Sequence, residues 1–210
     1  MSDITVYWRG WTEKQLAAYQ QNQGSTNHCG KYAAASALNM LFDTSLAGKS
    51  LVAWLEERPL KGTALYTIFG NHNGSFVFQT ANLIRKLSQL NGLAPSLKVS
   101  RGTIQTLKDT LQLGNKLVLV SVTYFQGQEP LITYGQNVGS SLAAARWVGG
   151  HLMILTAYDP QHQNTEKVST PWGFISSWPK KDYLYWMTNE DFKKSWGKLS
   201  LFNMVTVTRL

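Results

Sequence analysis

The sequence predicts an α+β protein, with helices in the first half of the chain and strands in the second. Apolar residues recur at helical spacing in several segments before residue 115. From Lys116 the chain becomes β-branched and apolar (KLVLVSVTYF), which is typical of a buried strand. At 210 residues, the chain is long enough for one core or for two lobes that share a cleft. We expect one domain, with a helical lobe over 1–115 and a β-rich lobe over 116–210.

The first half contains the candidate helices. Several are bounded by residues that begin or end helices: Thr12 can cap the first, Pro59 stops the third and Gly114 follows the last. The predicted helices are Thr12–Gln21, Cys29 to about Asp43, Ser50–Arg58, Phe78–Leu90 and Thr103–Leu113. Between the third and the fourth, a stretch rich in glycine and asparagine predicts a loop.

The second half contains the candidate strands. They are Lys116–Phe125, His151–Tyr158, Glu166–Thr170, Tyr183–Met187 and Asn203–Arg209. The glycine- and serine-bearing connection Gly127–Ala145 predicts a long loop at the edge of a cleft. A short capped helix beginning at Asn189 (NEDFKKSW) should precede the last strand. The aromatic residues from Trp172 to Trp196 have two interpretations, as the lining of a substrate cleft or as core packing between the sheet and this helix, and we expect core packing.

Cys29 is the only cysteine of the chain and lies where a polar run gives way to the second helix. At a helix start, the unpaired backbone N–H groups and the helix dipole favour a thiolate over a thiol. A lone cysteine also has a structural interpretation, as a small buried hydrophobic residue without chemistry. Gln23, six residues upstream, offers a neutral amide donor near the same place. Together these residues predict a nucleophile beside half of an oxyanion hole.

His151 is the candidate partner of Cys29. It begins a predicted buried strand, and the preceding Gly149 and Gly150 are expected to keep the approach of a substrate to its ring open. A single cysteine combined with a distant histidine is a sequence sign of a Cys–His nucleophilic pair.

Three short motifs carry a resemblance to a known family. They are Q-G-S-x-x-x-C-G from Gln23 to Gly30, G-G-H followed by an apolar strand from Gly149, and T-P-W-G from Thr170. In these motifs the chain resembles the papain-like cysteine peptidases, and most closely the compact bacterial C39-like branch. The resemblance implies a papain-like fold, in which the helix that carries Cys29 packs against a C-terminal antiparallel sheet that carries His151.

The reaction that follows assigns a role to each residue. Cys29 attacks a carbonyl carbon as a thiolate, and His151 balances its charge and then protonates the leaving group. The Cys29 backbone N–H and the Gln23 side chain hold the oxyanion of the tetrahedral intermediate. A thioester acyl-enzyme forms and is resolved by water or another nucleophile.

The residue behind the imidazole has two candidates. Where papain relatives carry Asn and C39-like relatives usually Asp, motif matching places Thr170, and Trp172 would shield the contact from water and lie near the substrate. A threonine hydroxyl can accept the imidazole hydrogen bond but carries no charge. Asp159 is charged, but it follows the strand that begins at His151, and eight extended residues span roughly 26 Å. We therefore expect Thr170 rather than Asp159.

Charge and composition restrict the partners. The net charge of +8 comes from scattered lysines and arginines, and no basic stripe or motif predicts nucleic-acid binding. The positive charge leaves an acidic polymer, such as cell-wall material, as an alternative partner. The four histidines and the cysteine lack metal-ligand spacing, and no glycine-rich loop fits a nucleotide motif, so we expect neither a metal nor a cofactor.

The expected location is the cytoplasm. The N-terminal segment MSDITVYWRGW lacks a signal-peptide pattern, and no apolar run approaches the length of a membrane span. A signal-independent export route stays open. A single cysteine also excludes an intrachain disulfide, so folding does not require an oxidising compartment. The sequence says nothing about oligomeric state.

Three function classes remain after this reading. The first and favoured one is a cysteine peptidase or amidase that cleaves a peptide or amide bond. The second is an acyl- or aminotransferase on the same scaffold, transglutaminase- or ligase-like, in which an amine intercepts the acyl-enzyme. The third is a catalytically inactive papain-like binding module. This class is favoured by the threonine at position 170, where the family carries Asn or Asp.

Overall fold

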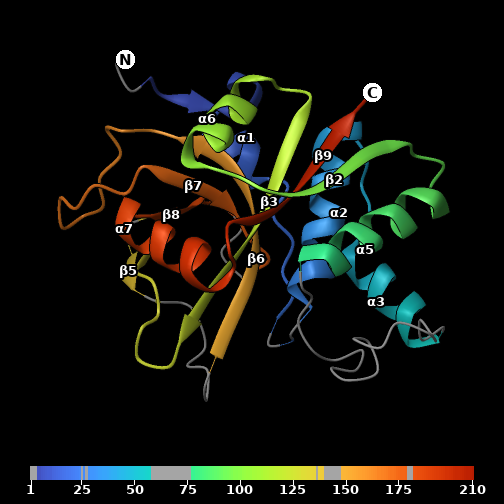
Figure 1. Cartoon of the computed structure of the whole chain (residues 1–210). Helices are drawn as coiled ribbons and strands as arrows, with labels where there is room; N and C mark the ends of the chain where they lie inside the picture. Colours follow the sequence, from blue (N-terminus) through green and yellow to red (C-terminus); the bar gives the residue numbers. More distant parts are fainter. Residues whose placement is uncertain are drawn as a thin grey trace.

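The computed structural model describes residues 4–24, 26, 28–57, 77–135, 137–139, 148–178 and 182–210 (Figure 1). It is an α+β structure, as the sequence predicts. In the described residues, the nine strands form one sheet with the order β2-β9-β3-β6-β7-β8-β4-β5, and β1 pairs with β6. The strands are β1 (Val6–Tyr7), β2 (Pro95–Arg101), β3 (Lys116–Phe125), β4 (Ile132–Tyr134), β5 (Asn137–Gly139), β6 (Val148–Tyr158), β7 (Trp172–Ile175), β8 (Tyr185–Met187) and β9 (Asn203–Arg209).

All pairs of neighbouring strands in this sheet are antiparallel. The helices around the sheet are α1 (Glu13–Ala17), α2 (Cys29–Phe42), α3 (Gly48–Glu57), α5 (Val77–Leu90), α6 (Ile104–Gln112) and α7 (Asn189–Phe192). A 3-10 turn, η1 (Trp8–Gly10), precedes α1, and a π-helix, η2 (Lys193–Leu199), continues α7. No helix among these described segments is both long and apolar enough to cross a bilayer.

Helix α2 is the central helix of the fold. It begins at Cys29 after the polar run, and Asp43 ends it in the left-handed conformation with φ of 56°. Nearly all of its residues are buried, because its alanines allow close approach of neighbours on every side. It packs against α3, α5 and the strands β3, β6 and β9. In Figure 1, α2, α3 and α5 gather to the right of β3 and β6, and α7 lies to their left.

The predicted helices are present, but α1 ends at Ala17, well before the predicted end at Gln21. In α1 the Thr12 side chain accepts from the Gln15 backbone N–H, and the Gln15 side chain accepts from the Thr12 N–H, which completes a capping box. Thr103 caps α6 in the same way through the N–H of Thr106. Most of the loop predicted after α3 lies outside the described residues.

The prediction of a strand at Glu166–Thr170 is wrong. This segment is a turn, because the Asn164 side chain accepts hydrogen bonds from the backbone N–H groups of Glu166 and Val168. Lys167 adopts a positive φ of 59°, which a strand does not allow. The strand begins later, at Trp172, and forms β7.

The sheet also contains strands that the sequence did not predict, and two of them, β1 and β2, come from the first half of the chain. β2 forms an edge of the sheet against β9, and its side chains are mostly exposed, so its hydrophobic pattern is weak. β1 is only two residues long. The connection Gly127–Ala145, read as a loop, contains β4 and β5, while 136 and 140–147 lie outside the described residues. The sheet therefore draws strands from both predicted lobes, and the division at residue 115 stays a prediction.

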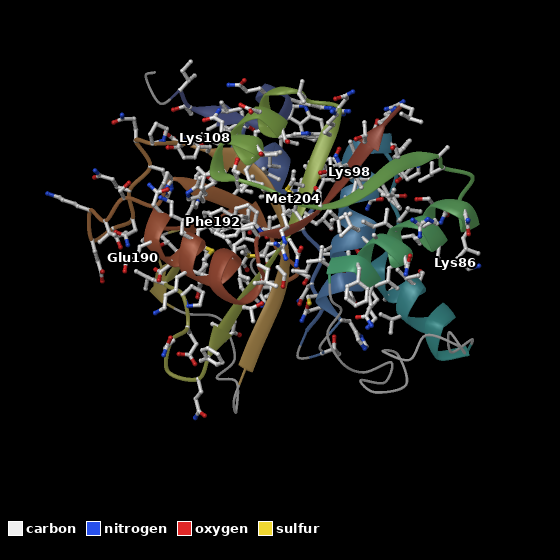
Figure 2. The ribbon with its side chains drawn as sticks, viewed as in Figure 1. Lys86, Lys98, Lys108, Glu190, Phe192 and Met204 are labelled. Carbon is white, nitrogen blue, oxygen red and sulfur yellow. The ribbon has the colours of Figure 1, made fainter. Side chains whose placement is uncertain are left out.

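The aromatic residues between β7 and η2 are core, as expected. Phe192 packs against Trp172 and Phe174 of β7, with ring centroids 5.0 and 5.2 Å away. Figure 2 shows Phe192 on the side of α7 that meets the sheet, with Glu190 on the outer side. The exception in the region is Tyr183, which is 47% exposed.

Candidate active site

The site is built on the first residue of α2 and on strand β6. Cys29 lies at the N-terminus of α2, as predicted, and His151 lies near the start of β6. Each retains only 5% of its exposure. Because α2 packs against β6, the two residues belong to elements in direct contact.

The neighbouring strand β3 links these two residues. In the β3–β6 register, Val122 lies opposite His151 and Tyr124 lies opposite Gly149. Burial raises the pKa of Tyr124 to about 12, and the charges of Glu129 and Cys29 add to the rise. Helix α2 packs against both β3 and β6, so Cys29, Tyr124 and His151 belong to three elements in mutual contact.

The imidazole of His151 is held on two sides. Its Nε2 lies 2.8 Å from the hydroxyl oxygen of Ser176, and the Trp178 ring stacks on it with centroids 4.0 Å apart and planes at 15°. Burial lowers the pKa of His151 to about 3, so the ring is neutral in the whole physiological range. Ser176 is itself 4% exposed and carries no charge to oppose this effect.

The register of β6 with β7 explains why Ser176 occupies this place. Ile154 lies opposite Ile175 in this antiparallel pair. Continued by one and by three residues beyond Ile175, the same register brings Ser176 opposite Met153 and Trp178 opposite His151. Alternate residues of a strand share a face, so Ser176 and Trp178 both return to the face of His151.

Thr170 is not the partner of His151, which corrects the motif-based expectation. Its hydroxyl lies 2.8 Å from Nδ1 of His162, whose ring stacks on Trp186 with centroids 3.8 Å apart. Trp172, expected near the substrate, is fully buried, lies opposite Tyr158 and donates its ring N–H to Asn189. Both residues lie at the far end of β6, because the antiparallel turn reverses the chain there.

Asp159 also lies away from His151. β6 continues to Tyr158, so Asp159 follows the end of the strand opposite to His151. Its carboxylate accepts hydrogen bonds from the Thr5 hydroxyl at 2.9 Å and from the Gln161 N–H at 3.0 Å. These bonds give Asp159 the turn-forming role that an Asp-Pro pair usually has.

Gln23 is tied to the residue after Ser176. The Ser177 hydroxyl donates to the Gln23 side-chain oxygen, and the Gln23 backbone N–H donates to the Ser177 carbonyl at 2.9 Å. The Gln23 amide nitrogen donates to the Thr26 carbonyl. The dipeptide Ser176–Ser177 therefore holds the imidazole with one hydroxyl and the amide of Gln23 with the other.

A second glutamine supports the same dipeptide. Gln20 is 5% exposed; its side-chain oxygen accepts from the Ser176 N–H at 3.3 Å, and its amide nitrogen donates to the Tyr183 carbonyl. The sequence analysis did not identify Gln20, Ser176 or Ser177 as site residues, and it expected Trp178 in the core. The signal for the two serines was the strand WGFI, whose recognition as β7 would have placed them beside His151; Gln20 had no such signal.

Gly150 is exposed, and an added Cβ there would meet its nearest neighbour, the Val122 carbonyl oxygen, at 3.6 Å. A pocket of about 320 Å³ lies nearby, beside the end of β3, lined by Thr123, Tyr124, Phe125, Gln128, Pro130, Asp191, Lys194 and Ser195. Two of these lining residues face the start of β6: Thr123 lies opposite Gly150, and Tyr124 lies opposite Gly149. Within the described segments, no three metal-ligating side chains gather into a cluster.

Comparisons with known proteins support the fold. A crystal structure from Bacillus anthracis, described as a "putative C39-like peptidase", is similar to this chain with a TM-score of 0.59 and 12% identity. The likeness covers 99% of each chain. No protein-family model matches the sequence. No curated protein matches it either. At this identity the likeness concerns the fold alone: the chain has the papain-like α+β fold of this C39-like structure.

Proposed function

We propose that the protein is a cysteine peptidase or amidase, which cleaves a peptide or amide bond through a thioester acyl-enzyme. The observation that carries the proposal is the seating of His151 against Ser176 and Trp178, on a strand that packs against the helix beginning with Cys29. The likeness to a C39-like structure supports the same class. A buried histidine with a fixed ring, close to a cysteine at a helix N-terminus, suits acyl transfer.

The neutral state of His151 changes the expected mechanism. Because burial lowers its pKa to about 3, the resting pair is a thiol and a neutral imidazole rather than an ion pair. His151 then acts as a general base: it takes the proton of Cys29 as the sulfur attacks the carbonyl carbon. It returns this proton to the leaving amine, and the same cycle with water releases the acid product.

The oxyanion of the tetrahedral intermediate needs donors that are fixed before the reaction. The Cys29 backbone N–H at the start of α2 is one, and the second hydrogen of the Gln23 amide is the other. The bond from Ser177 to the Gln23 oxygen sets which end of the amide is nitrogen. Ser176 and Ser177 thus act as positioning residues, each through a different partner.

The test measures reactivity and turnover separately. Cys29 is alkylated with iodoacetamide at pH 7 in the wild type, in His151→Ala and in His162→Ala. The last is a matched control, because His162 is also stacked on a tryptophan and bonded to a hydroxyl. We expect His151→Ala alone to slow alkylation. Equal rates in all three proteins would contradict the pair.

Turnover is then followed with unfolded casein as a general peptide substrate, by mass spectrometry of the products. New amino termini in the wild type and none in Cys29→Ala support hydrolysis. Products that gain the mass of an added amine, such as glycine methyl ester, indicate the transferase alternative. A reactive Cys29 without products from casein limits the proposal to narrower substrates, while an unreactive Cys29 indicates the binding module.

A further inference from the structure

Strand β2 is an edge of the sheet. In the described part of the chain it pairs only with β9, in an antiparallel register that runs from Pro95 opposite Arg209 to Arg101 opposite Asn203. An edge strand presents a row of backbone N–H and C=O groups with which another extended chain can pair. β2 is therefore a place where the sheet can accept a further strand.

The hydrogen bond just beyond the β2–β9 pair shows which backbone groups of β2 face outwards. The Gly102 N–H donates to the Phe202 carbonyl at 3.0 Å, so Gly102 directs its N–H towards the β9 side. In an antiparallel pair, a residue directs both its N–H and its C=O either towards the partner strand or away from it, and successive residues alternate. The residues of β2 that direct both groups away from β9 are therefore Leu97, Val99 and Arg101.

The side chains of β2 differ between its two faces. Lys98 lies on one face between two serines, whereas Leu97 and Val99 lie on the other. Lys98 and Arg101 are exposed, and Val99 is 47% exposed although it is apolar. Residues directly opposite each other on neighbouring strands interact through their side chains. A further strand on β2 would thus place apolar residues opposite Leu97 and Val99 and an acidic residue opposite Lys98.

The surroundings of this edge are basic. The sequence from 77 to 103, which covers α5 and β2, contains Arg85, Lys86, Lys98 and Arg101 and no acidic residue. β9, on which β2 is paired, adds Arg209 and also contains no acidic residue. Figure 2 shows Lys98 on β2 and Lys86 on α5 in the same half of the molecule. A cluster of one sign attracts a partner of the opposite sign, so the edge favours an acidic segment.

Backbone chemistry and charge together select the partner. A second copy of this chain, paired through its own β2, would bring the basic residues of both strands together, which like-charge repulsion disfavours. A nucleic acid offers phosphate oxygens, which accept hydrogen bonds from N–H groups but leave the outward C=O groups of Leu97 and Val99 unmatched. An extended peptide supplies both donors and acceptors. We propose that β2 binds an extended acidic segment of a partner protein as an additional strand of the sheet.

The probe is a fluorescein-labelled peptide of alternating glutamate and valine, as long as β2, whose binding to the full chain is followed by fluorescence anisotropy. Two N-methylated versions test strand pairing, because N-methylation removes chosen N–H groups and leaves the charge unchanged. In the proposed register the valines lie opposite Leu97 and Val99 and exchange hydrogen bonds with them, whereas the glutamate N–H groups point to solvent. We expect methylation of the valines to weaken binding about tenfold or more, and methylation of the glutamates to leave it unchanged.

Charge variants of the protein locate the binding surface. Lys98→Glu should weaken binding of the unmethylated peptide about tenfold, because attraction across an exposed pair becomes repulsion of similar size. Lys193→Glu is the matched control: it makes the same change in net charge on η2, which continues α7 on the other side of the molecule (Figure 1). We expect this control to bind like the wild type, and thermal unfolding checks that each variant is folded.

Four outcomes would overturn the proposal. Equal affinities of the two N-methylated peptides would mean that charge alone holds the peptide, and equal effects of Lys98→Glu and Lys193→Glu would place it elsewhere on the protein. Absence of binding by the unmethylated peptide, or its displacement by a single-stranded oligothymidylate of similar length, would remove an acidic peptide as the partner. A wild-type dimer in analytical ultracentrifugation that Val99→Pro dissociates would assign the edge to a second copy, because proline removes an outward N–H of β2 without breaking its pairing with β9.

Discussion

Nε2 of His151 lies 2.8 Å from the hydroxyl oxygen of Ser176. A hydroxyl in this place fixes the orientation and tautomer of the imidazole without adding a charge that would favour its protonated form. The structure contains a second such unit, His162 with Thr170 at the same distance, each histidine being stacked on a tryptophan. Only the first unit lies on a strand next to the N-terminus of α2. The His162–Thr170 unit can therefore serve as a control for the His151–Ser176 unit.

We expect Ser176→Ala to lower the alkylation rate of Cys29 at pH 7 about tenfold, because one hydrogen bond to the imidazole is lost. Ser176→Asn should retain reactivity, since an amide oxygen can accept the same bond. Thr170→Ala, the control, removes the matching bond of His162 and should leave the rate unchanged. A loss of reactivity in Thr170→Ala equal to that in Ser176→Ala would return the role to Thr170.

Gln23→Ala should reduce turnover about 100- to 1000-fold while the protein stays folded, as expected for a lost oxyanion donor. Gln20→Ala should behave differently, because Gln20 joins two backbone groups of the sheet and is buried. We expect it to lower the free energy of unfolding by about 1–3 kcal/mol. Casein turnover and urea unfolding of both variants check this; full turnover in Gln23→Ala excludes its role.

The stability of the protein should fall as the pH drops from 6.5 to about 3. In this range the unfolded chain binds a proton at His151 that the folded protein does not accept, because burial lowers the folded pKa to about 3. One such residue contributes a slope of at most about 1.4 kcal/mol per pH unit, and nothing above pH 6.5. Burial also lowers the pKa of His162, which adds in the same direction.

His151→Gln removes this contribution. Urea unfolding of wild type and variant at pH 4, 5 and 7 should show a weaker pH dependence in the variant, with the remaining slope due to His162 and the carboxylates. Identical slopes in the two proteins would mean that His151 can be protonated in the folded state.

Gly173→Ala should destabilise the protein by about 1–3 kcal/mol. An added Cβ there would meet Ala157 and Trp186 carbons at 2.9 Å, in the centre of the sheet. Gly150→Ala is the matched control in the same pair of strands, because its Cβ would have 3.6 Å of room. Thermal unfolding of both variants measures the difference, and equal melting temperatures would contradict the packing argument.

Most of the helices could be predicted because their signals are local. Thr12 and Thr103 carry the N-caps of α1 and α6, and apolar residues recur at helical spacing after Thr103. β3 could likewise be predicted, since most of its residues are apolar and buried. β2 could not be predicted in this way: its side chains are largely exposed, and it is a strand because β9 offers it a partner.

The residues of the candidate site likewise fall into those that the sequence could predict and those that it could not. Cys29 and His151 are identifiable as residues because a lone cysteine at a helix start and a histidine after two glycines are recognisable in the sequence. Their pairing remains a proposal. The residue behind the imidazole was misassigned to Thr170, because a four-residue motif cannot report the register between β6 and β7.

The sequence by itself determined the order of helices and strands, the start of α2 at Cys29 and the buried strand of His151, all of which depend on neighbouring residues in the chain. Only the tertiary structure decided that Ser176 and Trp178 contact the His151 ring and that Tyr124 lies on the neighbouring strand. The reason is geometric: a shift of one residue in an antiparallel register moves every side chain to the opposite face. That register is set by packing across the whole sheet, which no short motif contains.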